Sequence, residues 1–109
     1  MPTMPLIGRE YTLAVFIPDS AILVATDDLL STKFSREFVI LNLKDGVYYG
    51  LEEAGARVWE LLQSPVTLRA ICDAISAEYD VAPARCERDT RSLVDDLVSR
   101  GLVTVRESS

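Results

Sequence analysis

Residues 38–62 constrain the fold more than any other segment, because they predict a strand, a tight turn, a second strand and a helix in succession. Asp45-Gly46 lies at the turn, and both residue types tolerate the positive φ angles of a two-residue type I′ turn. Such a turn would place Lys44 opposite Val47 and Leu41 opposite Gly50. The second strand, Val47–Leu51, would then offer outward N–H and C=O groups to an extended peptide at a sheet edge.

Two further strands are expected upstream of this hairpin. The apolar runs Tyr11–Ile17 and Ile22–Thr26 are separated by the breaker Pro18-Asp19-Ser20. The polar stretch Asp27–Glu37 is predicted to be a loop, in which the apolar side chains of Leu29, Leu30 and Phe34 act as anchors.

Three helices are expected downstream, because apolar residues recur there with helical spacing. The first spans about 53–63. Thr67 is expected to cap the second helix, and Pro83 suits the first turn of the third. Gly101 is expected to end the third helix in a left-handed conformation, with Leu102 folding back onto it.

This order of elements predicts an α+β domain, with a three-stranded antiparallel β-meander followed by a three-helix bundle. The expected organisation is an N-terminal extension (1–20) that can add a strand, a folded domain (21–105) and a disordered tail (106–109). An apolar fraction of 49% argues against disorder of the whole chain.

The charge balance bears on partners and location. Seventeen acidic and eleven basic residues give a net charge of −6, without a Lys/Arg cluster, whereas nucleic-acid surfaces usually show a basic face. The chain has no run of 18 apolar residues and no basic segment leading into an apolar one at its start. We therefore expect a cytoplasmic protein that binds neither nucleic acid nor a membrane.

The residues that usually perform catalysis are largely missing. The chain has no histidine, and its adjacent carboxylates are better explained as solvated surface charges than as acid–base pairs. Cys72 and Cys86 lie on the apolar stripes of predicted helices, which favours two small buried thiols over a disulfide or a metal site. We expect no catalytic residue, no metal and no cofactor, and hence a protein that is not an enzyme.

Features suited to binding are stronger. Both faces of the predicted hairpin are apolar, whereas a half-exposed sheet normally has one polar face. Either helices and Tyr11–Ile17 cover the two faces, or part of the second face is left for a partner. Of Tyr48 and Tyr49, one is expected in the core and one at an interface. Gly50 indicates either a close backbone approach or a bulge.

Several spaced motifs resemble the PqqD family. They are Leu-Asn-Leu-x-x-Gly-x-Tyr-Tyr-Gly-Leu from Leu41, Gly-Ala-x-x-Trp-x-Leu-Leu from Gly55, Thr-Leu-Arg-Ala-Ile from Thr67, Glu-Tyr-Asp-Val from Glu78, and Asp-x-x-x-Leu-Val-x-x-Leu-x-x-x-Gly-Leu-Val from Asp89. Together they cover about Ala21 to Val103. One departure is Glu52, where the family often has Asn ahead of the first helix, and this puts a helix cap in doubt.

The resemblance implies a winged helix-turn-helix-like fold and a role as a peptide chaperone, or precursor-peptide recognition element. Such a protein binds the leader of a ribosomally made precursor peptide by strand addition and delivers it to a modifying enzyme or leader protease. Lasso peptide and PQQ-like pathways are the implied contexts. The implied peptide groove, between the third strand and the third helix, is lined by Val47, Tyr48, Tyr49, Gly50, Leu51, Arg85, Asp89, Ser92, Leu93 and Asp96.

Two other readings stay open from the residues alone. A winged-helix DNA-binding transcriptional regulator would share the helices and the hairpin, but the predicted third helix carries Asp89, Asp95 and Asp96 beside its arginines. A homodimer could instead use the second apolar face of the hairpin.

The charge pattern generates a first prediction. We expect no sequence-specific binding to duplex DNA at physiological salt, because a net charge of −6 opposes the approach to phosphates. An electrophoretic mobility shift assay against a random duplex library tests this expectation. Retention of particular sequences, weakened by added salt, would contradict it.

Overall fold

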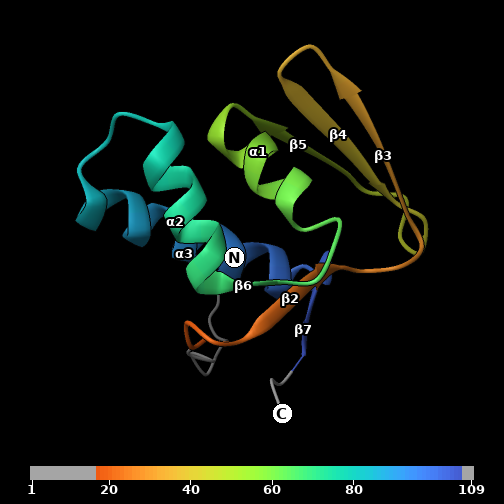
Figure 1. The fold of residues 1–109 in the computed structure, drawn as a ribbon. Coiled ribbons are helices and arrows are strands. Elements are labelled where there is room, and N and C mark those ends of the chain that lie inside the picture. The colour runs from red at the N-terminus through yellow and green to blue at the C-terminus, as the bar shows by residue number, and fades with distance from the viewer. Residues whose placement is uncertain (1–16, 107–109) are drawn as a thin grey trace, which may run out of the picture.

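The computed structural model describes residues 17–106 (Figure 1). In chain order the elements are β2 (Ile22–Ala25), β3 (Leu29–Phe34), β4 (Glu37–Asn42), β5 (Tyr48–Glu52), α1 (Ala54–Leu61), β6 (Val66–Thr67), α2 (Leu68–Glu78), α3 (Pro83–Ser99) and β7 (Val103–Arg106). The strands form two antiparallel sheets with the orders β3-β4-β5 and β6-β2-β7. The expected α+β class is confirmed, whereas the strand predicted at Tyr11–Ile17 falls almost wholly outside the described residues.

The meander is made of β3, β4 and β5, which differs from the prediction in two ways. Strand β3 occupies most of the stretch predicted to be a loop, so that prediction was wrong. Its sequence is largely polar because β3 is an edge strand whose side chains are mostly exposed. The predicted strand at residues 22–26 exists as β2, but it lies at the centre of the second sheet, between β6 and β7.

The predicted turn of the hairpin was also wrong. Leu41 lies opposite Tyr48, and Val39 lies opposite Gly50, so the register differs by two residues from the expected one. Residues 43–47 lie between the two strands, and the Asn42 N–H donates to the Val47 carbonyl oxygen, which encloses a four-residue turn, 43–46. The Gly46 N–H donates to the Asn42 carbonyl oxygen at 2.8 Å. The Asn42 side chain accepts from the Lys44 N–H, which stabilises this wider turn. Gly46 has a φ of +72°, as the turn chemistry predicted.

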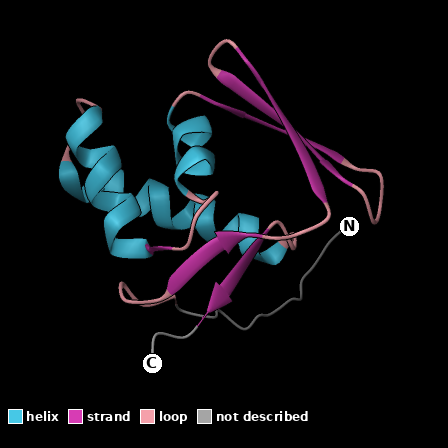
Figure 2. Ribbon diagram, turned by 45° about the vertical axis from the view of Figure 1, so that its right-hand side comes forward, coloured by secondary structure: helices cyan, strands magenta, loops and turns pink. Residues whose placement is uncertain are grey.

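Helix α1 lies between the meander and the other two helices, and it makes contact with β4, β5, α2 and α3 (Figures 1 and 2). Its side chains Val58 and Trp59 are fully buried, as are Ile40 of β4 and Ile71 of α2. One continuous apolar core therefore joins the sheet to the helices, and the helix-facing surface of the meander is covered.

The starts of α1 and α2 differ as the sequence suggested. Thr67 Oγ1 accepts a hydrogen bond from the Ala70 N–H at 3.1 Å, which confirms the predicted cap of α2. Helix α1 has no such side-chain cap in the described part of the chain, and Glu53 before it has a φ of +50°. The N-cap position is thus Glu53, and Glu52, where the sequence departs from the family pattern, is the last residue of β5.

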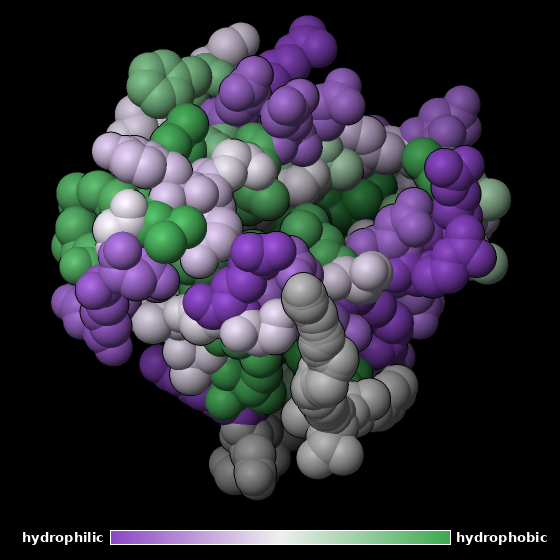
Figure 3. All heavy atoms as spheres, turned by 180° about the vertical axis from the view of Figure 1, so that it is seen from behind, coloured by the Kyte–Doolittle hydropathy of each residue, from purple (hydrophilic) through white to green (hydrophobic). Residues whose placement is uncertain are grey.

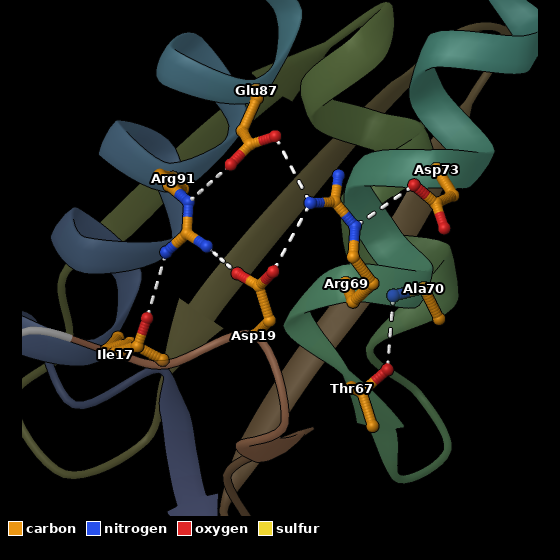
Figure 4. A network of polar contacts seen from close by, with 8 residues as sticks. All are labelled: Ile17, Asp19, Thr67, Arg69, Ala70, Asp73, Glu87 and Arg91. Carbon is orange, nitrogen blue, oxygen red and sulfur yellow. Dashed lines mark hydrogen bonds and ion pairs between the residues drawn. The ribbon is translucent and has the colours of Figure 1, made fainter.

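Ion pairs attach the segment before β2 to two helices (Figure 4). Asp19 contacts Arg69 of α2 and Arg91 of α3, and Glu87 contacts the same two arginines at 3.2 and 3.1 Å. Arg91 also donates to the carbonyl oxygen of buried Ile17. The network orders the entry to β2, and it lies apart from the β5 edge of the meander.

Helix α3 ends as predicted. Gly101 has a φ of +78°, and its N–H donates to the Val98 carbonyl oxygen. The Leu102 N–H donates to the Leu97 carbonyl oxygen at 2.9 Å, and the Leu102 side chain is fully buried. These bonds form a Schellman motif, which turns the chain sharply into β7.

This cap leads to a prediction about stability. Gly101→Val should lower the free energy of unfolding by roughly 1–2 kcal/mol, because a β-branched residue is strained at positive φ. Gly101→Asn is the matched control and should lose much less, because asparagine tolerates this conformation. Urea denaturation followed by circular dichroism measures both losses. Equal losses for the two variants would argue that backbone strain is not the cause.

Candidate functional site

Strand β5 has a free edge. Within residues 17–106 it pairs only with β4, and the sheet order places it at the margin of the meander. The Asn42 N–H donates to the Val47 carbonyl oxygen, and the Glu53 N–H donates to the Arg36 carbonyl oxygen. Because backbone groups alternate in direction along an antiparallel strand, Tyr48, Gly50 and Glu52 direct their N–H and C=O groups outward. These are the groups that an added strand would use.

The side chains of β5 divide between two surfaces. Tyr49 and Leu51 are half-buried and pack against the core on the side of the helices. Tyr48 lies on the opposite face and is 68% exposed. Tyr48 lies opposite Leu41 of β4, and Leu41 lies opposite Leu30 of β3. Leu30 is 56% exposed. The structure therefore places Tyr49 against the core and leaves Tyr48 exposed.

Helix α3 lies on the same side of the meander as α1 and makes contact with it (Figure 1). Leu93 is half-buried, whereas Arg85, Asp89, Ser92 and Asp96 are exposed. Two of the acidic residues pair along the helix: Arg85 Nε lies 3.6 Å from Asp89 Oδ2, and Arg100 Nε lies 2.9 Å from Asp96 Oδ2. The side of α3 nearest to β5 therefore combines an apolar residue with charges that are neutralised locally.

Arg100 connects the end of α3 to β5. Its guanidinium carbon lies 5.5 Å from the centre of the Tyr49 ring, which is a cation–π distance. The hydrogen bond to Asp96 raises the pKa of the Arg100 guanidinium above its ordinary value, so the group stays charged. This contact holds Tyr49 in place at one end of the space between β5 and α3.

The space between β5 and α3 has an apolar floor. A Cβ atom built on Gly55 would lie 3.6 Å from Leu51 Cδ2 and 3.7 Å from Leu93 Cδ2, so the side chains of these two leucines flank Gly55. A cavity of about 250 Å³ begins at Gly55 and Leu93 and extends among the three helices, with no β5 residue in its lining. Its lining is mainly apolar and includes Val58, Ile75 and Tyr79. Seen from behind, apolar surface lies in a recess with polar residues around it (Figure 3).

The structure brings together only part of the predicted set. Leu51 and Leu93 both lie next to Gly55, and Arg100 contacts both Tyr49 and Asp96. Asp89 lines the cavity, whereas Val47 precedes β5 at the exposed end of the hairpin. The predicted set omitted Gly55, Tyr79, Thr90 and Arg100. A glycine inside a helical pattern was the available signal for Gly55; the others depend on tertiary packing.

A second cavity, of about 310 Å³, lies between the β3–β4 turn and α1. Two of its three cationic residues already form ion pairs: Lys33 with Glu60 at 2.8 Å, and Arg57 with Glu78 at 2.9 Å. Most of the positive charge in this cavity is therefore neutralised by carboxylates of the protein itself.

The thiols and carboxylates suggest no further chemistry. Cys72 and Cys86 are free and buried, and burial raises the pKa of the Cys72 thiol, which disfavours the reactive thiolate. In the part of the chain that the structure describes, no group of three or more His, Cys, Asp or Glu side chains is arranged to hold a metal ion.

None of the helices of residues 17–106 combines the length and apolar character needed to cross a membrane.

Comparison with known proteins now identifies the family. The family profile described as "Coenzyme PQQ synthesis protein D (PqqD)" matches residues 37–103. The chain belongs to the PqqD family. A search of curated proteins finds no match.

Two solved structures share the PqqD-like fold of this chain. "TbiB1 in Complex with the TbiA(beta) Leader Peptide" is 36% identical, with a TM-score of 0.69, and the match covers 73% of this chain and 93% of TbiB1. "Lasso peptide synthetase B1 complexed with the leader peptide" is 21% identical, with a TM-score of 0.66 and coverage of 75% and 96%. The second likeness concerns the fold alone.

The two tyrosines of β5 provide a prediction about the site. Tyr49→Ala should destabilise the fold by roughly 2 kcal/mol, because it removes a half-buried ring and its contact with Arg100. Tyr48→Ala is the matched control on the adjacent residue and should change stability by no more than about 0.5 kcal/mol. Urea denaturation midpoints measure both effects. A larger loss for Tyr48→Ala would show that the faces of β5 are reversed.

Proposed function

We propose that this PqqD-family protein binds the leader region of a ribosomally synthesised precursor peptide without catalysing a reaction itself. The leader adds as an antiparallel strand to the free edge of β5 and places alternate side chains in the space beside α3. The protein then delivers the bound precursor to a modifying enzyme or a leader protease of a lasso peptide or PQQ-like pathway.

One observation carries the proposal: a free strand edge lies beside an apolar groove in a chain that is 36% identical to a protein solved with a leader peptide. Backbone hydrogen bonds from Tyr48, Gly50 and Glu52 provide affinity that depends little on leader sequence. Apolar contacts with Leu51 and Leu93 provide selectivity.

The DNA-binding alternative has no comparable support. The groups of α3 that face solvent include Asp89, Asp95 and Asp96, and Arg85 and Arg100 are paired with two of these carboxylates. A recognition helix needs basic side chains that are available to phosphates and base edges. The geometry of this helix is better suited to flanking a peptide.

A proline scan of β5 tests the strand addition. Proline removes one backbone N–H, and the N–H of Gly50 points outward whereas that of Tyr49 points toward β4. Gly50→Pro and Tyr48→Pro should therefore weaken leader binding by roughly tenfold or more, as expected for a lost backbone hydrogen bond plus misfit of the proline ring. Tyr49→Pro should instead disrupt the hairpin.

The probe is fluorescein-labelled TbiA(beta) leader peptide, chosen because TbiB1 is 36% identical to this chain. Fluorescence anisotropy gives the affinity, and circular dichroism reports whether each variant is folded. A folded Gly50→Pro variant that retains full affinity would exclude pairing at this edge. Failure of the unmodified protein to bind the leader would contradict the proposed function as a whole.

A further inference from the structure

Two glycines near the proposed site are not required by the fold. Gly50 and Gly55 both lack the positive φ that Gly46 and Gly101 show. A Cβ atom on Gly50 would meet no described heavy atom within 4 Å, and one on Gly55 would make only ordinary van der Waals contacts. Glycine weakens both strands and helices relative to alanine, so neither position is explained by backbone geometry or steric exclusion.

The position of Gly55 indicates what its missing side chain leaves free. It lies in the first turn of α1, between Leu51 of β5 and Leu93 of α3, and it lines the 250 Å³ cavity. A side chain there would project into the groove, over the leucines that form its floor. The cost to helix stability is thus coupled to the cavity that begins at Gly55 and Leu93, next to the place where a peptide beside β5 would direct its inner side chains.

We propose that Gly55 is a specificity-determining residue, which lets the groove accept one large apolar leader side chain over Leu51 and Leu93. This inference rests on the proposed function. The cavity of about 250 Å³ is lined by Gly55 and Leu93 and adjoins Leu51 only through Gly55. An apolar cavity of about 150 Å³ can hold a benzene molecule, so this cavity accommodates an aromatic ring or a branched aliphatic group. The leader partner is thus a peptide with one such anchor among the residues that face the helices.

The proposal makes stability and binding change in opposite directions. Gly55→Ala should raise the melting temperature by roughly 2–4 °C, because alanine favours the helix. The same variant should weaken leader binding about fourfold, since displacing one methylene from an apolar contact changes affinity by roughly that factor. Gly55→Leu fills the space and should weaken binding more than about tenfold.

Ala77→Leu is the matched control, because it enlarges an exposed side chain on helix α2 outside the cavity. It should leave leader affinity unchanged. Labelled TbiA(beta) leader is titrated by anisotropy against the unmodified protein and the three variants, with melting temperature as the folding control. If Gly55 acts only through the fold, its variants should change melting temperature and leader affinity in the same direction, or should lose no affinity. Either result would overturn the proposal.

A double-mutant cycle identifies the anchor. Each apolar residue of the leader is replaced in turn by alanine, and the affinities are measured with the unmodified protein and with Gly55→Leu. At one leader position the alanine replacement should weaken binding to the unmodified protein but cause little further loss with Gly55→Leu, because the pair acts as one contact. If the affinity losses of Gly55→Leu and of the leader replacement are additive at every leader position, no leader side chain contacts the region of Gly55, even if the leader binds to β5. Absence of leader binding to the unmodified protein would reject the proposed function instead.

Discussion

The packing of α1 beneath the meander is the interaction on which the site depends. Val58 and Trp59 are buried in the same core as Ile40 of β4, and α1 also makes contact with α2 and α3. This helix therefore fixes the distance between β5 and α3. Because the cores of folded proteins are densely packed and resist deformation, the groove beside Gly55 is held by the fold before any peptide arrives. Preorganisation of this kind lowers the entropic cost of binding.

Exposure of the β5 edge follows from how the strands are connected. The meander ends at β5, and the chain then enters α1 through Glu53 without returning to cover the edge in residues 17–106. Unpaired edges favour aggregation, and proteins usually protect them. Here Glu52, a charged residue, and Gly50, a weak strand former, lie among the outward-directed residues. Both features oppose indiscriminate pairing yet leave the backbone accessible to one strand.

Sequence patterns predicted the faces of the hairpin better than its register. The register was wrong by two residues, because the side chain of Asn42 supports a four-residue turn that dipeptide chemistry did not indicate. A shift by two keeps each side chain on its face and each N–H in its direction. The inward direction of the Tyr49 N–H and the outward direction of the Gly50 N–H were therefore predicted correctly, although the turn was wrong. A shift by one residue would have reversed them.

Strands β3, β6 and β7 were beyond such reasoning for a different reason. The residues of β3 are mostly polar, β6 has two residues, and β7 is held by pairing with β2, which is distant in sequence. The same limit applied to Tyr79, Thr90 and Arg100, whose positions near the groove depend on how the helices pack. Helix ends depend on local sequence, which is why the Thr67 cap and the Gly101 motif were predictable.

Backbone and side chains have separate roles in this site. A strand edge binds many sequences, because its hydrogen bonds involve groups that nearly every residue has. Selectivity must then come from the few inner side chains, and near Gly55 these are two leucines and an apolar cavity. Apolar contacts of this size distinguish residues by roughly 1–3 kcal/mol. A single anchor thus separates one extended peptide from another only modestly. Under the proposed function, discrimination must therefore also draw on the enzyme that would receive the bound precursor.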